Sequence, residues 1–290
     1  MAKRAHSGYA YYDAQQDPHT PERLGLVGEL REAIEHDELT LAYQPQIALD
    51  THQVTGVEAL VRWAHPRRGM IPPVEFVAIA EHTGLMEPLT RCVLRGALQQ
   101  CRTWLDKGLH LPVSVNISAT DLQDGFAQVV EELLDAHHVP VEYLRLEITE
   151  GAMMVDRDRA SRVLQDLRAL GVRISIDDYG TGYSSLAYLG HLPIDELKID
   201  RSFIAGLLSS TANAAIVRST IALGHDLGLV VVAEGVEDQP TWDVLGELGC
   251  DTIQGYLASK PLSAAALESW IVERSSAPSL SSGSRLRRVA

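Results

Sequence analysis

Oxygen-bearing and charged side chains recur where the apolar runs of this 290-residue chain end. They are Glu58 in VEALVRW, Asn116 in VSVNIS, Glu147 in LRLEIT, Asp177 and Asp178 in ISIDDYG, Lys198 in ELKID and Glu234 in VVVAEGV. Each run has the β-branched and aliphatic composition of a buried strand, and most runs precede a helical pattern. A buried carboxylate is costly to desolvate unless it is paired or bound to a cation. The recurrence therefore predicts that the strand ends converge on one metal site.

The alternation of strand and helix patterns predicts an α/β fold, a modified TIM (β/α)8 barrel. Strands are expected at 39–49, 56–64, 112–118, 143–149, 172–178, 195–200, 229–235 and 252–258. Helices are expected from about residue 24, then at 74–83, 87–106, 125–137, 157–170, 212–227, 239–248 and 263–274, with a short turn near 184–190. The connection DTHQVT between the first two strands is too short for a parallel crossover, so the first strand should run against the rest.

Composition restricts the classes of function that the chain can have. With 25 Lys and Arg against 39 Asp and Glu, the formal charge of −14 argues against binding to nucleic-acid polymers or anionic membranes. No apolar stretch approaches the roughly 18 residues that span a bilayer, and the N-terminus lacks the apolar region of a signal peptide. The three cysteines form no CxxC site. We therefore expect a cytoplasmic chain with no membrane contact of its own, which leaves open a membrane-anchored parent protein.

Three segments are expected along the chain. Residues 1–21 are polar and lack periodicity, residues 22–274 hold the barrel, and the Ser-rich residues 275–290 read as a disordered tail.

The paired aspartates occur in the stretch DDYGTGYSS. Adjacent residues of a continuous strand point to opposite faces, so both carboxylates reach one site only where the strand breaks. Gly180 and Gly182 are expected to supply that break. Taken alone, the stretch is more typical of an acidic turn that caps the following helix. The segment GTGYSS lacks the third glycine of a dinucleotide-binding fingerprint.

Each remaining residue also has an ordinary structural explanation. Asn116 could cap its loop, and Glu147 and Glu150 could belong to an acidic loop. Lys198 is harder to explain in this way, because alternation with Leu197 and Ile199 points it into the barrel, where an unpaired lysine is rare. Taken together, the oxygen donors favour Mg²⁺ or Mn²⁺ over zinc, and their number favours two ions.

The chain resembles the EAL-domain cyclic di-GMP phosphodiesterases over about residues 22–274. The matching motifs are YQP at 43–45, EALVRW at 58–63, HPxxGxIxP at 65–73, AExxGL at 80–85, NIS at 116–118, ExTE at 147–150, DDYGTGYSSL at 177–186, LKID at 197–200, EGVE at 234–237 and QGYL at 254–257. The resemblance implies a modified barrel whose first strand is antiparallel. It also implies hydrolysis of cyclic di-GMP to linear pGpG. Tyr179 stands where phenylalanine is commoner in the family.

The resemblance also implies a role for each matching residue. Glu58, Asn116, Glu147, Asp177, Asp178 and Glu234 would hold the two ions, and Lys198, Glu234 and Glu58 would act in catalysis. Gln44, Leu60, Arg62, Asp200, Glu237 and Gln254 would contact the substrate or support the site. Glu150 and Ser184 would fix the loop that follows the paired aspartates, close to the contact of a homodimer. Ca²⁺ is expected to inhibit, binding without supporting hydrolysis.

Two alternatives remain at this point: a catalytically weak domain that binds cyclic di-GMP as a receptor, and a scaffolding barrel that uses only its surface. The stretch AKRAHSGYAYYD resembles the end of a GGDEF domain. It predicts that a GGDEF domain is covalently linked in a longer parent protein.

Overall fold

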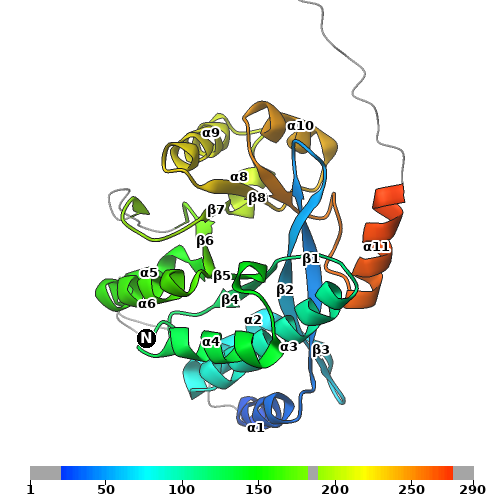
Figure 1. Cartoon of the computed structure of the whole chain (residues 1–290), viewed down its shortest axis with the longest axis vertical. Helices are drawn as coiled ribbons and strands as arrows, with labels where there is room; N and C mark the ends of the chain where they lie inside the picture. Colours follow the sequence, from blue (N-terminus) through cyan, green and yellow to red (C-terminus); the bar gives the residue numbers. More distant parts are fainter. Residues whose placement is uncertain (1–20, 182–188, 277–290) are drawn as a thin grey trace, which may run out of the picture.

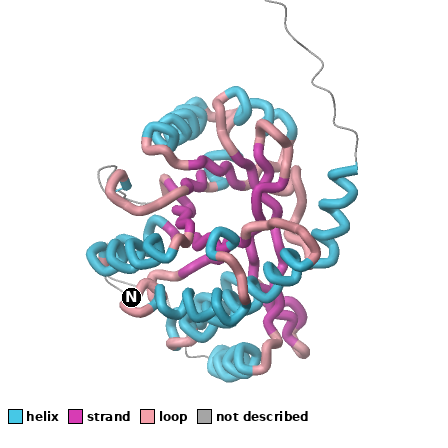
Figure 2. The backbone as a smooth tube through the Cα atoms, viewed as in Figure 1, coloured by secondary structure: helices cyan, strands magenta, loops and turns pink. Residues whose placement is uncertain are grey.

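The computed structural model describes residues 21–181 and 189–276. Within these residues the strands form one nine-stranded sheet in the order β1-β9-β8-β7-β6-β5-β4-β2-β3, and an additional pairing of β1 with β2 closes all but β3 into a barrel. Figure 2 shows the strands at the centre with helices around them. The predicted (β/α) barrel is therefore confirmed.

The strands are β1 (Leu39–Ala48), β2 (Val54–His65), β3 (Gly69–Ile71), β4 (Val113–Ile117), β5 (Leu144–Thr149), β6 (Arg173–Tyr179), β7 (Glu196–Ile199), β8 (Val230–Glu234) and β9 (Thr252–Gln254). The helices are α1 (Pro21–Glu35), α2 (Pro73–Thr83), α3 (Met86–Asp106), α4 (Phe126–His137), the 3₁₀ turn η1 (Val141–Tyr143), α5 (Glu150–Val155), α6 (Arg157–Leu170), α8 (Arg201–Ala205), α9 (Thr211–Asp226), α10 (Gln239–Glu247) and α11 (Ala264–Ser276). In Figure 1, α5 and α6 lie beside β5 and β6, and α11 lies along β1 and β2.

The first strand runs against its neighbours, as its short connection predicted. β1 pairs antiparallel with both β2 and β9, whereas the pairings from β2 through β4 to β9 are parallel. The short strand β3 was not predicted. It forms a hairpin with β2 outside the barrel, and its first residue, Gly69, adopts a φ of 72°.

The strands are apolar on the face toward the helices and polar on the face toward the barrel axis. On β7, Leu197 and Ile199 belong to the buried apolar core, while Lys198 contacts groups across the barrel. The buried polar residues at the corresponding positions are Gln44, Gln46, Glu58, Ser114, Arg145, Glu147, Ser175, Asp177, Glu196, Thr252 and Gln254. Branched aliphatic side chains fill the interior of most such barrels. Here the interior is mainly polar, and most of the apolar core lies between strands and helices.

Local signals fix the ends of several helices. Asp156 caps α6 by accepting a hydrogen bond from the backbone N–H of Arg159 at 3.1 Å, and Gly171 ends it with a φ of 94°. The helices α5 and α8 were not predicted, because each is only one or two turns long and has no repeating apolar pattern. No helix in the described ranges has the length and apolarity needed to cross a membrane.

Some predictions fall on residues outside the described ranges. These are the N-terminal segment up to residue 20, most of the turn near 184–190, and the tail from residue 277. The last strand, expected to reach residue 258, ends at Gln254. The next residue is Gly255, where a Cβ would lie 2.1 Å from the Val236 backbone oxygen.

Candidate active site

A fully buried lysine lies at the centre of the site. Lys198 on β7 places its Nζ 2.5 Å from Glu147 Oε2 and 2.6 Å from Glu234 Oε1. The same Nζ lies 3.3 Å from Asp177 Oδ1 and 3.8 Å from Glu58 Oε2. These four carboxylates come from β2, β5, β6 and β8, so the strands bring together groups that are far apart in the sequence. We call Lys198 and its four carboxylates the upper cluster.

The upper cluster has more negative charge than one lysine can neutralise. Burial raises the pKa of Glu147 well above its usual value and raises that of Glu234 to about 8, against the pull of Lys198. Burial alone would lower the pKa of Lys198, but the surrounding carboxylates outweigh it and raise the pKa well above its usual value. Glu147 Oε1 is buried without a hydrogen-bond partner among the described residues. An orphaned carboxylate oxygen within a negatively charged cluster fits a site for divalent cations.

The paired aspartates reach the cluster because the strand breaks at the second of them. Asp178 adopts a φ of 54°, a left-handed conformation that few residues other than glycine adopt, and the pairing of β6 with β7 shifts between Ile176 and Tyr179. The break was predicted at Gly180 and Gly182, and the structure adds Asp178 to it. Gly180 contributes with a φ of 96°, and Gly182 lies outside the described residues.

A compact group of donor atoms results from this break. Oxygen atoms of Asp177, Asp178 and Glu234 all lie within 4.8 Å of one another. Burial, followed by the charges of Asp177 and Asp200, raises the pKa of Asp178 to about 6. Crowding of this kind is costly without a counterion, so this edge of the cluster is the second place where a cation fits.

Side-chain amides hold the carboxylate of Glu58. Asn116 Nδ2 donates to Glu58 Oε1 at 2.6 Å, and Gln254 Nε2 donates to Glu58 Oε2. Gln254 Nε2 also donates to Gln44 Oε1 at 3.3 Å. These contacts, those of Lys198 and the grouping of Asp178 with Asp177 and Glu234 bring together all six residues predicted as metal ligands.

One cavity opens directly onto the upper cluster. It has a volume of about 220 Å³ and is lined by Gln44, Glu58, Asp177, Arg201, Glu234, Gly235, Glu237, Gln254, Gly255 and Tyr256. Arg201 and Tyr256 were not predicted as site residues, although Arg201 directly follows the LKID motif. Gly235 has a φ of 69°, and a Cβ there would lie 2.6 Å from Arg201 Cβ, so only glycine fits at this position beside Arg201.

Asp200 lies beside this cavity but does not line it. Its Oδ1 accepts a hydrogen bond from the backbone N–H of Ser202 at 3.0 Å and so caps α8. This contact explains why Arg201, the first residue of α8, is held next to the carboxylates.

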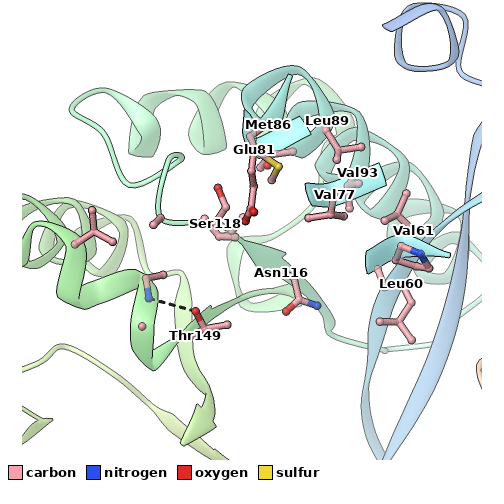
Figure 3. A pocket seen from close by; sticks show the side chains of 18 of the residues that line it. Leu60, Val61, Val77, Glu81, Met86, Leu89, Val93, Asn116, Ser118 and Thr149 are labelled. Carbon is pink, nitrogen blue, oxygen red and sulfur yellow. Dashed lines mark hydrogen bonds between the residues drawn. The ribbon is translucent and has the colours of Figure 1, made fainter. Parts of the chain in front are cut away.

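A larger cavity of about 520 Å³ lies on the other side of Asn116, between the ends of β2, β4 and β5 and the helices α2 and α3 (Figure 3). The apolar walls of this cavity are formed by Leu60, Val77, Met86, Leu89 and Val93. Its polar groups come from Arg62, Glu81, Asn116, Ser118 and Thr149. Leu60 and Arg62 were predicted to contact substrate. Glu81 was missed as a site residue, although it belongs to the AExxGL motif.

Glu150 connects the first turn of α5 to the loop after β6. It is 2% exposed, and its Oε2 accepts a hydrogen bond from the backbone N–H of Gly180 at 3.0 Å. Its predicted partner Ser184 lies outside the described residues.

The family model of the EAL domain matches residues 27–261. The chain therefore belongs to the EAL domain family.

Curated relatives include two proteins of Pseudomonas aeruginosa. The chain is 42% identical over 261 residues to the bifunctional diguanylate cyclase/cyclic di-GMP phosphodiesterase MucR, covering 89% of this chain and 38% of the relative. It is 39% identical over 266 residues to the cyclic di-GMP phosphodiesterase PA2567, covering 91% of this chain and 45% of the relative. The chain thus spans less than half the length of these relatives.

Solved structures show the same fold. The chain matches the complex of the PaMucR phosphodiesterase with c-di-GMP at a TM-score of 0.80 and 44% identity, covering 84% of this chain and 99% of that one. It matches the c-di-GMP-bound EAL domain of FimX from Pseudomonas aeruginosa at a TM-score of 0.76 and 26% identity, covering 82% and 96%.

Proposed function

We propose that this chain hydrolyses one phosphodiester bond of cyclic di-GMP and releases linear pGpG. The observation that carries the proposal is the upper cluster, in which four carboxylates surround one buried lysine. Relatives at about 40% identity named as cyclic di-GMP phosphodiesterases support the choice of substrate.

In this proposal the site binds two divalent ions, Mg²⁺ or Mn²⁺. Glu58, Asn116, Glu147 and Asp177 would hold one ion, and Asp177, Asp178 and Glu234 the other. When bound, such ions neutralise the phosphate oxygens and lower the pKa of a coordinated water. Oxygen donors without histidine or cysteine suit these hard cations.

The chain's own residues would then position the reacting groups. Lys198 keeps its proton among four carboxylates, so it serves as a hydrogen-bond donor that orients the attacking water and stabilises negative charge. We assign proton acceptance to Glu234, which lies within hydrogen-bond distance of Lys198 at the edge of the cavity. Gln254 and Asn116 would keep the plane of the Glu58 carboxylate fixed.

The smaller cavity opens onto the upper cluster, and the larger one is lined by Asn116, which bonds Glu58 of that cluster. Two cavities near one cluster suit a substrate with one base on each side of the scissile phosphate. We assign one guanine to the larger cavity, where apolar walls surround the ring and the Glu81 carboxylate can accept hydrogen bonds from it. Arg62 would contact a phosphate there. On the other side, Gln44, Glu237 and Arg201 would contact the second nucleotide.

The test is product chromatography with purified protein and cyclic di-GMP. We expect pGpG with Mg²⁺ or Mn²⁺ and none with EDTA. Ca²⁺ prefers longer bonds and a looser geometry, so calorimetry in Ca²⁺ should show substrate binding while chromatography shows no turnover. A metal-replete, folded sample that binds substrate but never turns it over would instead support a receptor.

We further propose a homodimer that contacts through the loop after β6 and the segment around residues 200–225. In support, Leu208 and Ile216 on this segment are 55% and 38% exposed, and Glu150 ties the loop to α5. Light scattering should show twice the monomer mass at micromolar concentration. A fully active monomer would contradict the proposal.

A further inference from the structure

A chain of buried hydrogen bonds runs from the far end of the barrel interior to the upper cluster. Arg145 Nη1 lies 2.9 Å from Glu196 Oε2 and donates at 2.9 Å to Gln46 Oε1. Gln46 Nε2 donates to Gln254 Oε1 at 3.1 Å, and Gln254 Nε2 donates to Glu58 Oε2. All five residues are at most 8% exposed, so water does not substitute for these contacts.

The two ends of this chain determine the direction of every bond within it. An arginine can only donate hydrogen bonds, so Gln46 must turn its carbonyl toward Arg145 and its NH₂ group toward Gln254. Gln254 must then accept on its carbonyl and present its own NH₂ group to Glu58, which as a carboxylate can only accept. Reversing either amide would place two acceptors or two donors face to face in the barrel interior, at the cost of a lost buried hydrogen bond.

The orientation of the Gln254 amide decides whether Glu58 faces a hydrogen-bond donor or an acceptor. With the NH₂ group of Gln254 on Oε2 and that of Asn116 on Oε1, both oxygens are fixed while each keeps lone pairs that can face a cation. With the amide reversed, the carbonyl of Gln254 would face the carboxylate and repel it. Outer-shell hydrogen bonds of this kind orient metal ligands in proteins.

We propose that Gln46 and Arg145 are positioning residues for the metal site: Arg145 sets the direction of the two glutamine amides, which hold Glu58 ready for a cation. The inference rests on the metal-dependent function proposed above. Neither residue lines either cavity beside the upper cluster, so their effect passes through Gln254 and Glu58.

The test measures Mn²⁺ affinity in the absence of substrate, from the electron paramagnetic resonance signal of the free ion. Gln46→Met removes the link but leaves the Arg145–Glu196 ion pair intact, and should weaken Mn²⁺ binding about 10-fold. Gln46→Glu still accepts from Arg145 but requires a donor from Gln254. It should therefore reverse that amide and weaken binding more, up to about 100-fold. Turnover at saturating Mn²⁺ should change far less in both variants.

Two further variants keep the result interpretable. Ser175→Ala removes a buried hydroxyl that lies in the same layer as Glu196 but makes no hydrogen bond among the described residues, so Mn²⁺ affinity should not change. The double variant Arg145→Met/Glu196→Met replaces the ion pair with apolar side chains, a change that buried pairs often tolerate, and frees Gln46 to turn. It should weaken Mn²⁺ binding in the same direction if Gln46→Met proves too unstable to purify.

Unchanged Mn²⁺ affinity in folded Gln46→Met and in the double variant would overturn this inference alone, provided that the wild type binds Mn²⁺. A wild type that binds no Mn²⁺ would overturn both this inference and the proposed function. A lower melting temperature with normal affinity would assign the chain of hydrogen bonds to stability only.

Discussion

The two ends of the barrel interior are both largely buried but differ in charge balance. In the upper cluster, four carboxylates surround one lysine. At the other end, which we call the floor layer (Gln46, Arg145, Ser175 and Glu196), one arginine pairs with one glutamate at 2.9 Å and also donates a hydrogen bond to Gln46. A balanced ion pair is explained by folding alone. A buried surplus of like charge is not, and so it marks the functional end.

The surplus of buried carboxylates in the upper cluster also lowers the stability of the folded protein. Burial first, and then repulsion between the crowded carboxylates, raises the pKa values of Glu147, Asp178 and Glu234. Sites of this kind are tolerated because a bound ligand relieves them, at the expense of stability in its absence. The comparison therefore predicts opposite effects when acidic residues are removed from the two layers.

The largest expected effect is on stability, in the floor layer. Glu196→Ala leaves Arg145 buried without its carboxylate partner, a change that costs about 3–5 kcal/mol of unfolding free energy. Urea denaturation should show a lower midpoint at an unchanged slope. Turnover per folded molecule should remain close to that of the wild type, since Arg145 still donates to Gln46. A loss of less than about 1 kcal/mol would show that the ion pair is not the stabilising contact of this layer.

Glu58→Ala is the matched substitution in the upper cluster, because Glu58 and Glu196 are 6% and 4% exposed. It removes a predicted metal ligand, and turnover of cyclic di-GMP should fall by more than about 100-fold, equivalent to about 2.7 kcal/mol of barrier. Stability should change by only about 1 kcal/mol, because the lost hydrogen bonds are offset by relief of repulsion. If both variants lose stability equally and keep their activity, the distinction between the two layers is wrong.

Much of this architecture could be predicted from the sequence, because it depends on local periodicity. The alternation of Lys198 with Leu197 and Ile199 correctly predicted an inward lysine, and the short connection after the first strand correctly predicted its antiparallel direction. The convergence of the predicted ligands could also be predicted from the sequence, because parallel strands bring their carboxyl ends to one face of the barrel.

The features that could not be predicted depend on contacts between segments that are far apart in the sequence or on unusual backbone conformations. Arg145 and Glu196 meet because the closed barrel faces β5 toward β7, and nothing near either residue in the sequence indicates that pairing. The break at Asp178 was assigned to glycines, since a positive φ is rare in other residues. Arg201 was missed because its place in the cavity depends on the close approach of Gly235.

The smallest predicted effect is a gain in stability. Asp178→Asn removes one charge from the crowded edge of the upper cluster, so in EDTA the variant should be more stable than the wild type by about 0.5–2 kcal/mol. The raised pKa, about 6 against an ordinary value of 3.8, means that the folded state holds this proton more tightly than the unfolded state. Wild-type stability is therefore lost as the pH rises through that window, and the advantage of the variant should grow from about pH 4 and be complete above about pH 6.

A second buried aspartate provides the control for that prediction. Asp121 is 5% exposed, and its Oδ2 accepts from Thr90 Oγ1 at 2.7 Å, from the Ser118 backbone N–H at 3.0 Å and from Ser118 Oγ at 2.8 Å. Because donors rather than carboxylates surround it, Asp121→Asn should destabilise the protein, by about 1–3 kcal/mol. The melting temperature of both variants is measured in EDTA and again with Mn²⁺. In EDTA the two variants should shift it in opposite directions. In Mn²⁺ the gain of Asp178→Asn should shrink or reverse, because the wild type gains more from the ion. If Asp178→Asn destabilises the metal-free protein at pH 8 as Asp121→Asn does, the carboxylates are not strained, and charge surplus does not separate the two ends of this barrel.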